Sequence, residues 1–139
     1  MAYIPEELRK WVIERAGGRC EYCYIHQSDG LYPHEVDHII PQKHRGRTVA
    51  DNLCFSCLDC NRNKGSDFAS FDPKTDEVNR LFDPRQDQWE DHFQLESAYI
   101  RPLTATGRVT EFVLKLNDEH RIRARIVLIA TGRYPDTTL

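Results

Sequence analysis

The chain has 139 residues, of which 40% are hydrophobic and 10% aromatic, so its composition excludes a disordered tail and fits one domain with a modest core. No apolar run approaches the roughly 18 residues of a membrane-spanning helix, and we expect no membrane span. The net charge of −3 argues mildly against a nucleic-acid partner, because lysine and arginine drive phosphate binding.

The charge is unevenly distributed along the chain. Residues 43–64 contain five Lys/Arg and two Asp, whereas residues 67–96 contain three Lys/Arg and nine Asp/Glu. Residues 97–139 are basic again, with seven Lys/Arg and four Asp/Glu. A locally basic region is compatible with nucleic-acid binding even when the total charge is slightly negative.

The first predicted element is a helix from Pro5 to about Ala16. Proline is tolerated in a first helical turn, the two glutamates after it suit the positive end of the helix, and a glycine pair after Ala16 ends it. The same segment is charged and lacks the apolar core of a secretory signal, so we expect a cytoplasmic protein.

The central region is predicted to run as strand, loop, return strand and helix. Val36–Ile40 contains β-branched residues and ends at Pro41, which is typical of a strand. Residues 49–53 form a plausible return segment. Cys57–Lys64 is predicted to be a short helix that ends at Gly65.

The second half has weaker signals. Residues 67–93 are expected to be irregular, with short helical turns. Residues 94–103 and 109–116 are predicted to form the two strands of a hairpin, and a last helix is predicted over about residues 117–131.

Two sets of side chains suggest how that last helix packs. Three isoleucines share one of its faces, which we expect to be buried: Ile122, Ile126 and Ile129. Three arginines spread charge around the helix axis and are expected to be solvated: Arg121, Arg123 and Arg125.

Four of the five cysteines form two C-x-x-C pairs, Cys20 with Cys23 and Cys57 with Cys60, separated by 33 residues. Cytosolic thiols stay reduced, so metal binding is favoured over disulfides. Four thiolates complete the tetrahedron that structural Zn²⁺ prefers and leave no open position for a substrate. The pattern therefore predicts a structural zinc site. Cys54 is expected to pack as a small apolar residue.

A second set of motifs lies between and within the cysteine pairs: Asp37-His38, then Asn52, then Asn61. In this order, and framed by the two cysteine pairs, residues 16–65 resemble the HNH endonuclease family. The resemblance implies an α+β fold with a ββα-metal core and a structural zinc, preceded by a helix. With the elements predicted above, one nuclease domain is expected over residues 1–139, with a core at about 16–66 and a hairpin-plus-helix extension, 67–139, packed on it.

The resemblance also implies an activity, the hydrolysis of DNA phosphodiester bonds, with double-stranded DNA as the expected partner. Asp37 and Asn61 would hold a divalent Mg²⁺ or Mn²⁺ ion, since hard cations bind oxygen. His38 is the candidate general base, because a neutral imidazole can take a proton from water near neutral pH. Asn52 would pin the loop so that the backbone orients the histidine ring.

Each of these assignments has a simpler alternative. His38 could be a surface residue or a hydrogen-bonded core residue. Asn61 could lie on the helix surface or support a metal ligand without binding the metal, and Asn52 could merely form a turn with its neighbour. Adjacent strand residues point to opposite faces, so Asp37 and His38 can share one phosphate only if the strand ends or distorts there. A whole-protein alternative is a zinc-stabilised nucleic-acid-binding module without catalysis.

Four basic residues are weaker candidates for phosphate contacts: Arg45, Arg47, Arg62 and Lys64.

A further motif is misleading. Residues 34–38 match H-E-x-x-H, the signature of helical zinc proteases, but Pro33 and Pro41 flank the segment and no long helix can carry it. The protease interpretation is therefore rejected.

Overall fold

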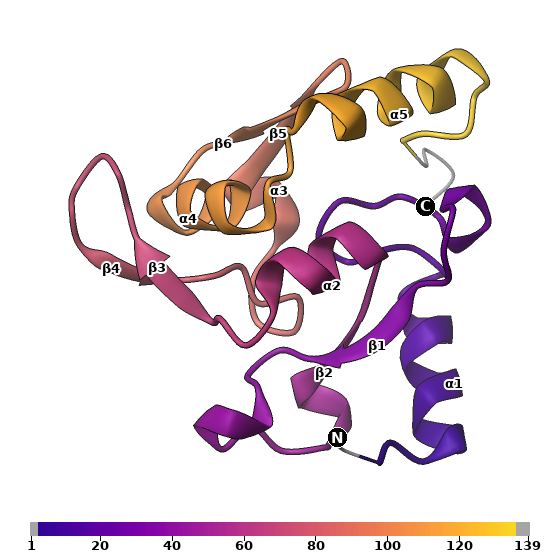
Figure 1. The fold of residues 1–139 in the computed structure, drawn as a ribbon, viewed down its shortest axis with the longest axis vertical. Helices are drawn as coiled ribbons and strands as arrows, with labels where there is room; N and C mark the ends of the chain where they lie inside the picture. Colours follow the sequence, from indigo (N-terminus) through magenta and orange to yellow (C-terminus); the bar gives the residue numbers. More distant parts are fainter. Residues whose placement is uncertain (1–2, 136–139) are drawn as a thin grey trace.

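The computed structural model describes residues 3–135 (Figure 1). It combines helices with small antiparallel sheets, so the expected α+β class is confirmed. Its helices are α1 (Glu6–Arg15), α2 (Leu58–Lys64), α3 (Trp89–His92), α4 (Ala105–Leu114) and α5 (Glu119–Ala130). Its strands pair as β1 (Glu35–His38) with β2 (Leu53–Ser56), β3 (Ala69–Phe71) with β4 (Val78–Arg80), and β5 (Phe93–Glu96) with β6 (Tyr99–Pro102). Within this part of the chain no helix is both long and apolar enough to span a membrane.

Helix α1 confirms the first predicted element. Its two glutamates lie in the first turn, where they suit the positive end of the helix dipole. Val12 is fully buried and belongs to the same apolar cluster as Leu53 and Phe55 of β2. Helix α1 therefore covers one face of that strand.

The predicted order of strand, strand and helix is confirmed in β1, β2 and α2, but both strand boundaries differ from those expected. Strand β1 ends at His38, with His38 opposite Leu53, instead of continuing to residue 40. Residues 50–52 form a 3₁₀ turn, so β2 begins at Leu53. The backbone N–H of Ile39 still donates to the Asn52 carbonyl at 2.8 Å, and the next backbone N–H, that of Ile40, bonds the Asn52 side chain.

The second cysteine pair lies at the start of α2. Cys57 precedes the first helical residue, and its Sγ accepts a hydrogen bond from the backbone N–H of Cys60 at 3.4 Å. Gly65, with a φ of +50°, ends the helix as predicted. Helix α2 thus carries metal-ligand candidates at its first turn.

The predicted hairpin over residues 94–116 is wrong. Both strands of the real hairpin, β5 and β6, lie within residues 93–102, and the chain turns at Ser97, which has a φ of +55°. Residues 105–114 form α4 instead of a strand. Thr104 explains the difference, because its Oγ1 accepts a hydrogen bond from the N–H of Gly107 and caps the helix.

The segment expected to be irregular, residues 67–93, forms the β3–β4 hairpin and the short helix α3. Asp72 at the end of β3 is fully buried. Its two carboxylate oxygens accept from Nε and Nη2 of Arg108 on α4, each at 2.8 Å. This bidentate pair fastens the hairpin to α4.

Helix α5 is confirmed, but the face it buries is not the expected one. The side chains of Arg121 and Arg125 are buried, with residue exposures of 5% and 2%, whereas Ile126 is 51% exposed. Arg125 donates hydrogen bonds to the carbonyl oxygens of Ala98 and Leu116. The inward arginines are stable because the groups around them accept hydrogen bonds.

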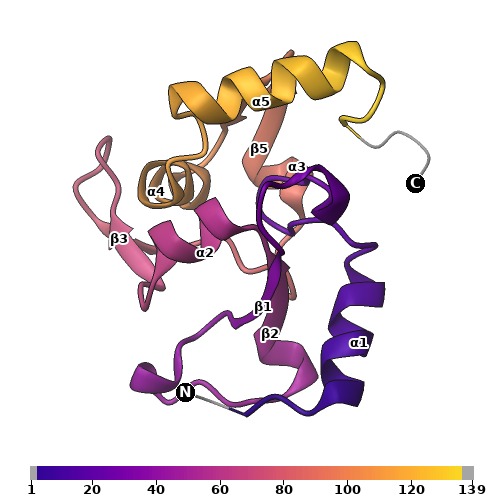
Figure 2. The ribbon, with the colours of Figure 1, turned by 45° about the vertical axis from the view of Figure 1, so that its right-hand side comes forward.

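The core is divided into two clusters, and β2 contributes to both. Cys54 belongs to the larger cluster around the other cysteines, whereas Leu53 and Phe55 belong to the cluster under α1. Figures 1 and 2 show α1 and α5 at opposite ends of the molecule, with α2 between them. Asn63 of α2 donates to the carbonyl of Leu114 on α4 at 2.9 Å. The division into a core at residues 16–66 and an extension at 67–139 stays a prediction.

Candidate active site and metal centre

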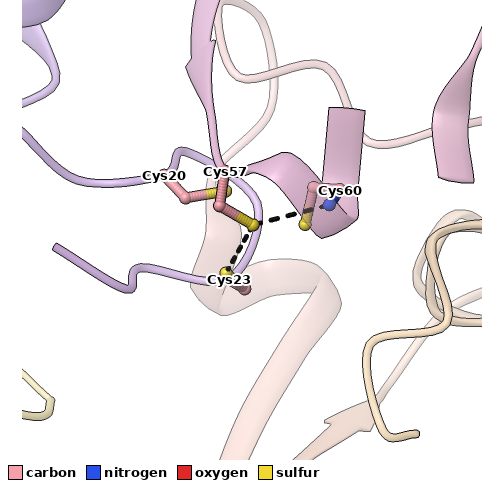
Figure 3. Close-up of side chains that lie close together, drawn as sticks. All are labelled: Cys20, Cys23, Cys57 and Cys60. Carbon is pink, nitrogen blue, oxygen red and sulfur yellow. Dashed lines mark hydrogen bonds between the residues drawn. The ribbon is translucent and has the colours of Figure 1, made fainter. Parts of the chain in front are cut away.

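Four cysteine side chains from two distant segments come together, as predicted (Figure 3). One ligand atom from each of Cys20, Cys23, Cys57 and Cys60 lies within 4.8 Å of all the others, and all four residues are buried. They are free thiols, so no disulfide competes for the sulfurs. This is a four-cysteine metal-binding cluster.

The dimensions of the cluster fit zinc. A tetrahedral ion with bonds of about 2.3 Å to sulfur places its ligands about 3.8 Å apart. The Sγ atoms of Cys23 and Cys57 are 3.7 Å apart, which is close to that edge length. The donor set of four sulfurs is also the one that structural zinc prefers. Cys54 is buried, as expected, but it is not one of the four metal-ligand candidates. Its Sγ lies beside the hydroxyl of Tyr22.

A cleft of about 560 Å³ lies beside the apolar cluster under α1, because Ile4, Ile13 and Phe55 line it. It is lined by Asp37 and His38 from the end of β1 and by Asn61 from α2. The two adjacent residues of β1 can both line it because the strand ends at His38. The cleft therefore brings together three of the polar residues singled out in the sequence.

Asp37 is a partly buried carboxylate that is paired with a lysine. Its Oδ2 is buried and has no hydrogen-bond partner among residues 3–135, although Lys64 Nζ lies 3.6 Å away. Burial raises the pKa of Asp37, while the charge of Lys64 opposes that effect. The ammonium of Lys64 is thus the cation that faces this buried oxygen and favours the ionised carboxylate.

His38 is held by one of its two ring nitrogens. Nε2 lies 2.9 Å from Thr48 Oγ1, and the backbone carbonyl of His38 accepts from Lys64 Nζ at 2.9 Å. Burial lowers the pKa of His38, more than the nearby Asp37 raises it. The ring is therefore neutral at physiological pH and able to accept a proton.

The amide of Asn61 is oriented by Glu35. Asn61 Nδ2 donates to Glu35 Oε2 at 3.3 Å, which fixes which end of the amide is the donor. Its Oδ1 is then available as a neutral oxygen ligand. Both residues line the same cleft.

A comparison with protein-family models matches residues 20–67 to the HNH endonuclease family. We call residues 20–67 the HNH domain, after the family whose model they match. The matched segment contains both cysteine pairs and all three of the cleft residues described above. Neither the curated proteins nor the solved structures include a significant match to the chain.

Within the HNH domain, Asn52 closes the loop that follows β1. Its side chain bonds the backbone of Ile40 and of Arg47. Gly46 makes this closure possible, because a Cβ there would lie 1.6 Å from the Ile40 carbonyl oxygen. The loop therefore has one compact path, which also carries Thr48 to His38.

The basic candidates of the HNH domain lie in different places. Arg45 and Arg47 are exposed on the loop after β1. Arg62 is exposed but lines a different groove, of about 460 Å³, beside α5. The structure corrects the expectation for Lys64, whose side chain is 2% exposed and is held by His38 and Asp37 inside the fold. Lys64 is therefore not a surface contact for phosphate.

Sequence reasoning missed two polar residues of the HNH domain that touch the candidates. Glu35 could have been found, because residues i and i+2 of a strand point to the same face and Glu35 is two residues before Asp37. Thr48 carries no local signal. It reaches His38 only because the loop from Pro41 to Arg47 is folded back.

Proposed function

We propose that this protein is a metal-dependent endonuclease that hydrolyses phosphodiester bonds in DNA. The observation that carries the proposal is that Asp37, His38 and Asn61 line one cleft within an HNH domain. The family comprises enzymes that act on nucleic acids. The three residue types supply what the reaction needs, a base and oxygen ligands for a divalent cation.

Asp37 and Asn61 would hold the catalytic Mg²⁺ or Mn²⁺ ion. The carboxylate of Asp37 and the Oδ1 of Asn61 offer oxygen ligands, which suit a hard cation. An ion bound there supplies neutralising charge to the scissile phosphate and the departing oxygen. Glu35 keeps the Asn61 amide in the orientation that offers its oxygen.

His38 would remove the proton from the attacking water. In the tautomer whose Nε2–H donates to Thr48 Oγ1, Nδ1 carries the lone pair and is the proton acceptor. The lowered pKa keeps this lone pair free at neutral pH. Lys64 contributes by holding the backbone carbonyl of His38.

The four cysteines would bind one structural Zn²⁺, which holds β2 and α2 against the first cysteine loop. Reduced thiols of this kind fit a cytoplasmic protein, the location we propose. The exposed Arg45 and Arg47 extend from the loop beside the cleft and are proposed to contact the backbone of double-stranded DNA.

The test is a nicking assay on supercoiled plasmid in the presence of Mg²⁺ or Mn²⁺. We expect cleavage that EDTA abolishes and that His38→Ala reduces by about 100- to 10,000-fold, the usual contribution of a general base. His120→Ala is the matched control, because this α5 histidine has a 67% exposed side chain and lies outside the HNH domain. It should cleave at the wild-type rate.

Undiminished cleavage by His38→Ala would refute the assigned mechanism. Loss of cleavage in Asp37→Asn and Asn61→Ala, with zinc content unchanged, would support separate roles for the two metals, a catalytic ion in the cleft and a structural zinc on the cysteines. A wild-type protein that binds DNA but never cuts it would support the alternative, a zinc-stabilised binding module.

A further inference from the structure

Arg121 of α5 is a buried arginine that lies against the cysteine cluster. Its Nη2 donates to Cys60 Sγ at 3.0 Å and lies 3.7 Å from Cys57 Sγ. Its Nη1 donates to the carbonyl oxygens of Leu114 and Lys115, at 2.7 and 3.3 Å. The side chain is only 4% exposed. The guanidinium is therefore fixed between the sulfurs on one side and the end of α4 on the other.

The charge of the cluster explains why a cation is needed there. Four thiolates around one Zn²⁺ carry a formal charge of about −2. Burial of such a charge is costly unless a cation or hydrogen-bond donors lie against it. Arg121 provides both at once, because its N–H groups point at the sulfurs of α2.

The buried charge of Arg121 also needs compensation. The carboxylate of Asp59 is 3.9 Å from Arg121 Nε and half exposed, so it compensates the buried charge weakly. The sulfurs of Cys60 and Cys57 lie closer to the guanidinium, and they are anionic when the cluster binds a metal, so that they then balance the buried charge.

We propose that Arg121 is the counter-charge of the four-thiolate site, and that the C-terminal extension is thereby part of the metal centre. Two other residues of that part of the chain bond the first cysteine loop. Tyr134 donates to the carbonyl of Cys23 at 2.7 Å, and Trp89 Nε1 donates to the carbonyl of Tyr22 at 2.9 Å. The inference concerns retention of the metal and does not depend on whether the cleft cleaves DNA.

The shape of the side chain matters as well as its charge. The planar guanidinium donates to a sulfur and to two carbonyl oxygens in different directions. A lysine has one ammonium on a flexible stem and cannot reproduce this fork. Arg121→Lys therefore separates the charge from the geometry, whereas Arg121→Met removes both and keeps much of the apolar stem.

The experiment measures loss of zinc from the full chain. Wild type, Arg121→Lys and Arg121→Met are loaded with zinc, and the metal content is measured. Transfer to an excess of a chromogenic zinc chelator is then followed. We expect Arg121→Met to bind zinc about 10- to 100-fold more weakly and to release it faster, as when an outer partner of a metal ligand is removed. Arg121→Lys should lie between the two.

Arg125→Met is the matched control. Arg125 is one turn further along α5 and equally buried, but it hydrogen-bonds carbonyl oxygens and Asn117, not sulfur. The Arg125→Met substitution should lower the free energy of unfolding while leaving zinc release at the wild-type rate. Alkylation of Cys57 and Cys60, read by mass spectrometry, should accelerate in Arg121→Met and not in the control.

Wild-type release and alkylation rates in Arg121→Met would overturn the inference, as would equal acceleration in Arg125→Met. If Arg121→Met does not fold even in excess zinc, Arg121→Lys decides, and a wild-type rate in that variant overturns the inference. A wild-type chain that binds no zinc refutes the zinc assignment itself. The nicking assay tests the nuclease proposal separately.

Discussion

Asn52 holds the backbone of Ile40 with both polar atoms of its side chain. Oδ1 accepts from the Ile40 N–H at 2.9 Å, and Nδ2 donates to the Ile40 carbonyl at 3.0 Å. The same Nδ2 also donates to the carbonyl of Arg47 at 2.9 Å. One amide therefore closes the loop two residues beyond His38, and the position of the histidine depends on it.

Replacing that amide should reduce cleavage without loss of zinc. Asn52→Asp keeps the acceptor and removes the donor, which leaves two backbone carbonyls without their partner. We expect the single-turnover cleavage rate to fall by about 100-fold, a typical result of misplacing a catalytic group. Asn79→Asp, in the β4 strand, is the control. A wild-type rate in Asn52→Asp would contradict the assigned role.

Gly46→Ala should damage the same loop by steric conflict. An added Cβ would lie 1.6 Å from the Ile40 carbonyl oxygen, so the backbone must shift, at a cost of about 1–3 kcal/mol of unfolding free energy. Gly17→Ala is the comparison, because a Cβ there meets no atom within 4 Å and the substitution is strained only by the φ of +64°. Urea denaturation and the nicking assay should show that Gly46→Ala loses stability and cleavage, and that Gly17→Ala loses stability only. Full activity in Gly46→Ala would mean that the loop path is not required.

The Asp72–Arg108 pair predicts a specific dependence of stability on pH. The hydrogen bonds from Arg108 hold the pKa of Asp72 well below its ordinary value of 3.8. A carboxyl whose pKa is lower in the folded state contributes its stability above the unfolded pKa, and that contribution is lost as the pH falls. The free energy of unfolding of wild type should therefore exceed that of Asp72→Asn by a constant amount near neutral pH.

Urea denaturation of both proteins in excess zinc, between about pH 8 and about pH 5, checks this expectation. The difference should shrink only below 3.8. A difference that already shrinks across the measured range would show that the carboxyl is not held in this way.

Removal of one cluster cysteine should abolish both metal binding and folding. We expect about one equivalent of tightly bound zinc in wild type and a loss of zinc and of folded structure in Cys57→Ser, because metal binding and folding are coupled in such sites. Cys54→Ser is the control, since Cys54 is equally buried but outside the cluster. Metal analysis and circular dichroism provide the measurements. A stable, metal-free wild type would be the contrary result.

The metal centre and its frame were predictable because their chemistry is encoded locally. A C-x-x-C turn presents two sulfurs together whatever the rest of the chain does, and a zinc ion joins two such turns. The order of β1, β2 and α2 follows from short β-branched and helical patterns around those turns. The placement of Asp37 and Asn61 in one cleft follows from that order.

The features that the sequence did not predict depend on contacts between residues that are distant in the chain. Thr104 and Gly107 fit either a hairpin turn or a helix cap, and the structure shows the cap. The burial of Arg121 depends on Cys60, which is 61 positions away in the sequence, and on a charge that exists only when the cluster is assembled. Lys64 likewise follows a helical pattern on the sequence, but its partners come from β1.

Both faces of β2 are buried, and this determines how short a fragment of the chain can be and still fold. Leu53 and Phe55 are covered by α1, which lies outside the segment matched to the HNH family. A polypeptide limited to residues 20–67 would expose that face to water even with its metal bound, and would be prone to aggregate. A version of this domain that folds on its own must therefore include α1.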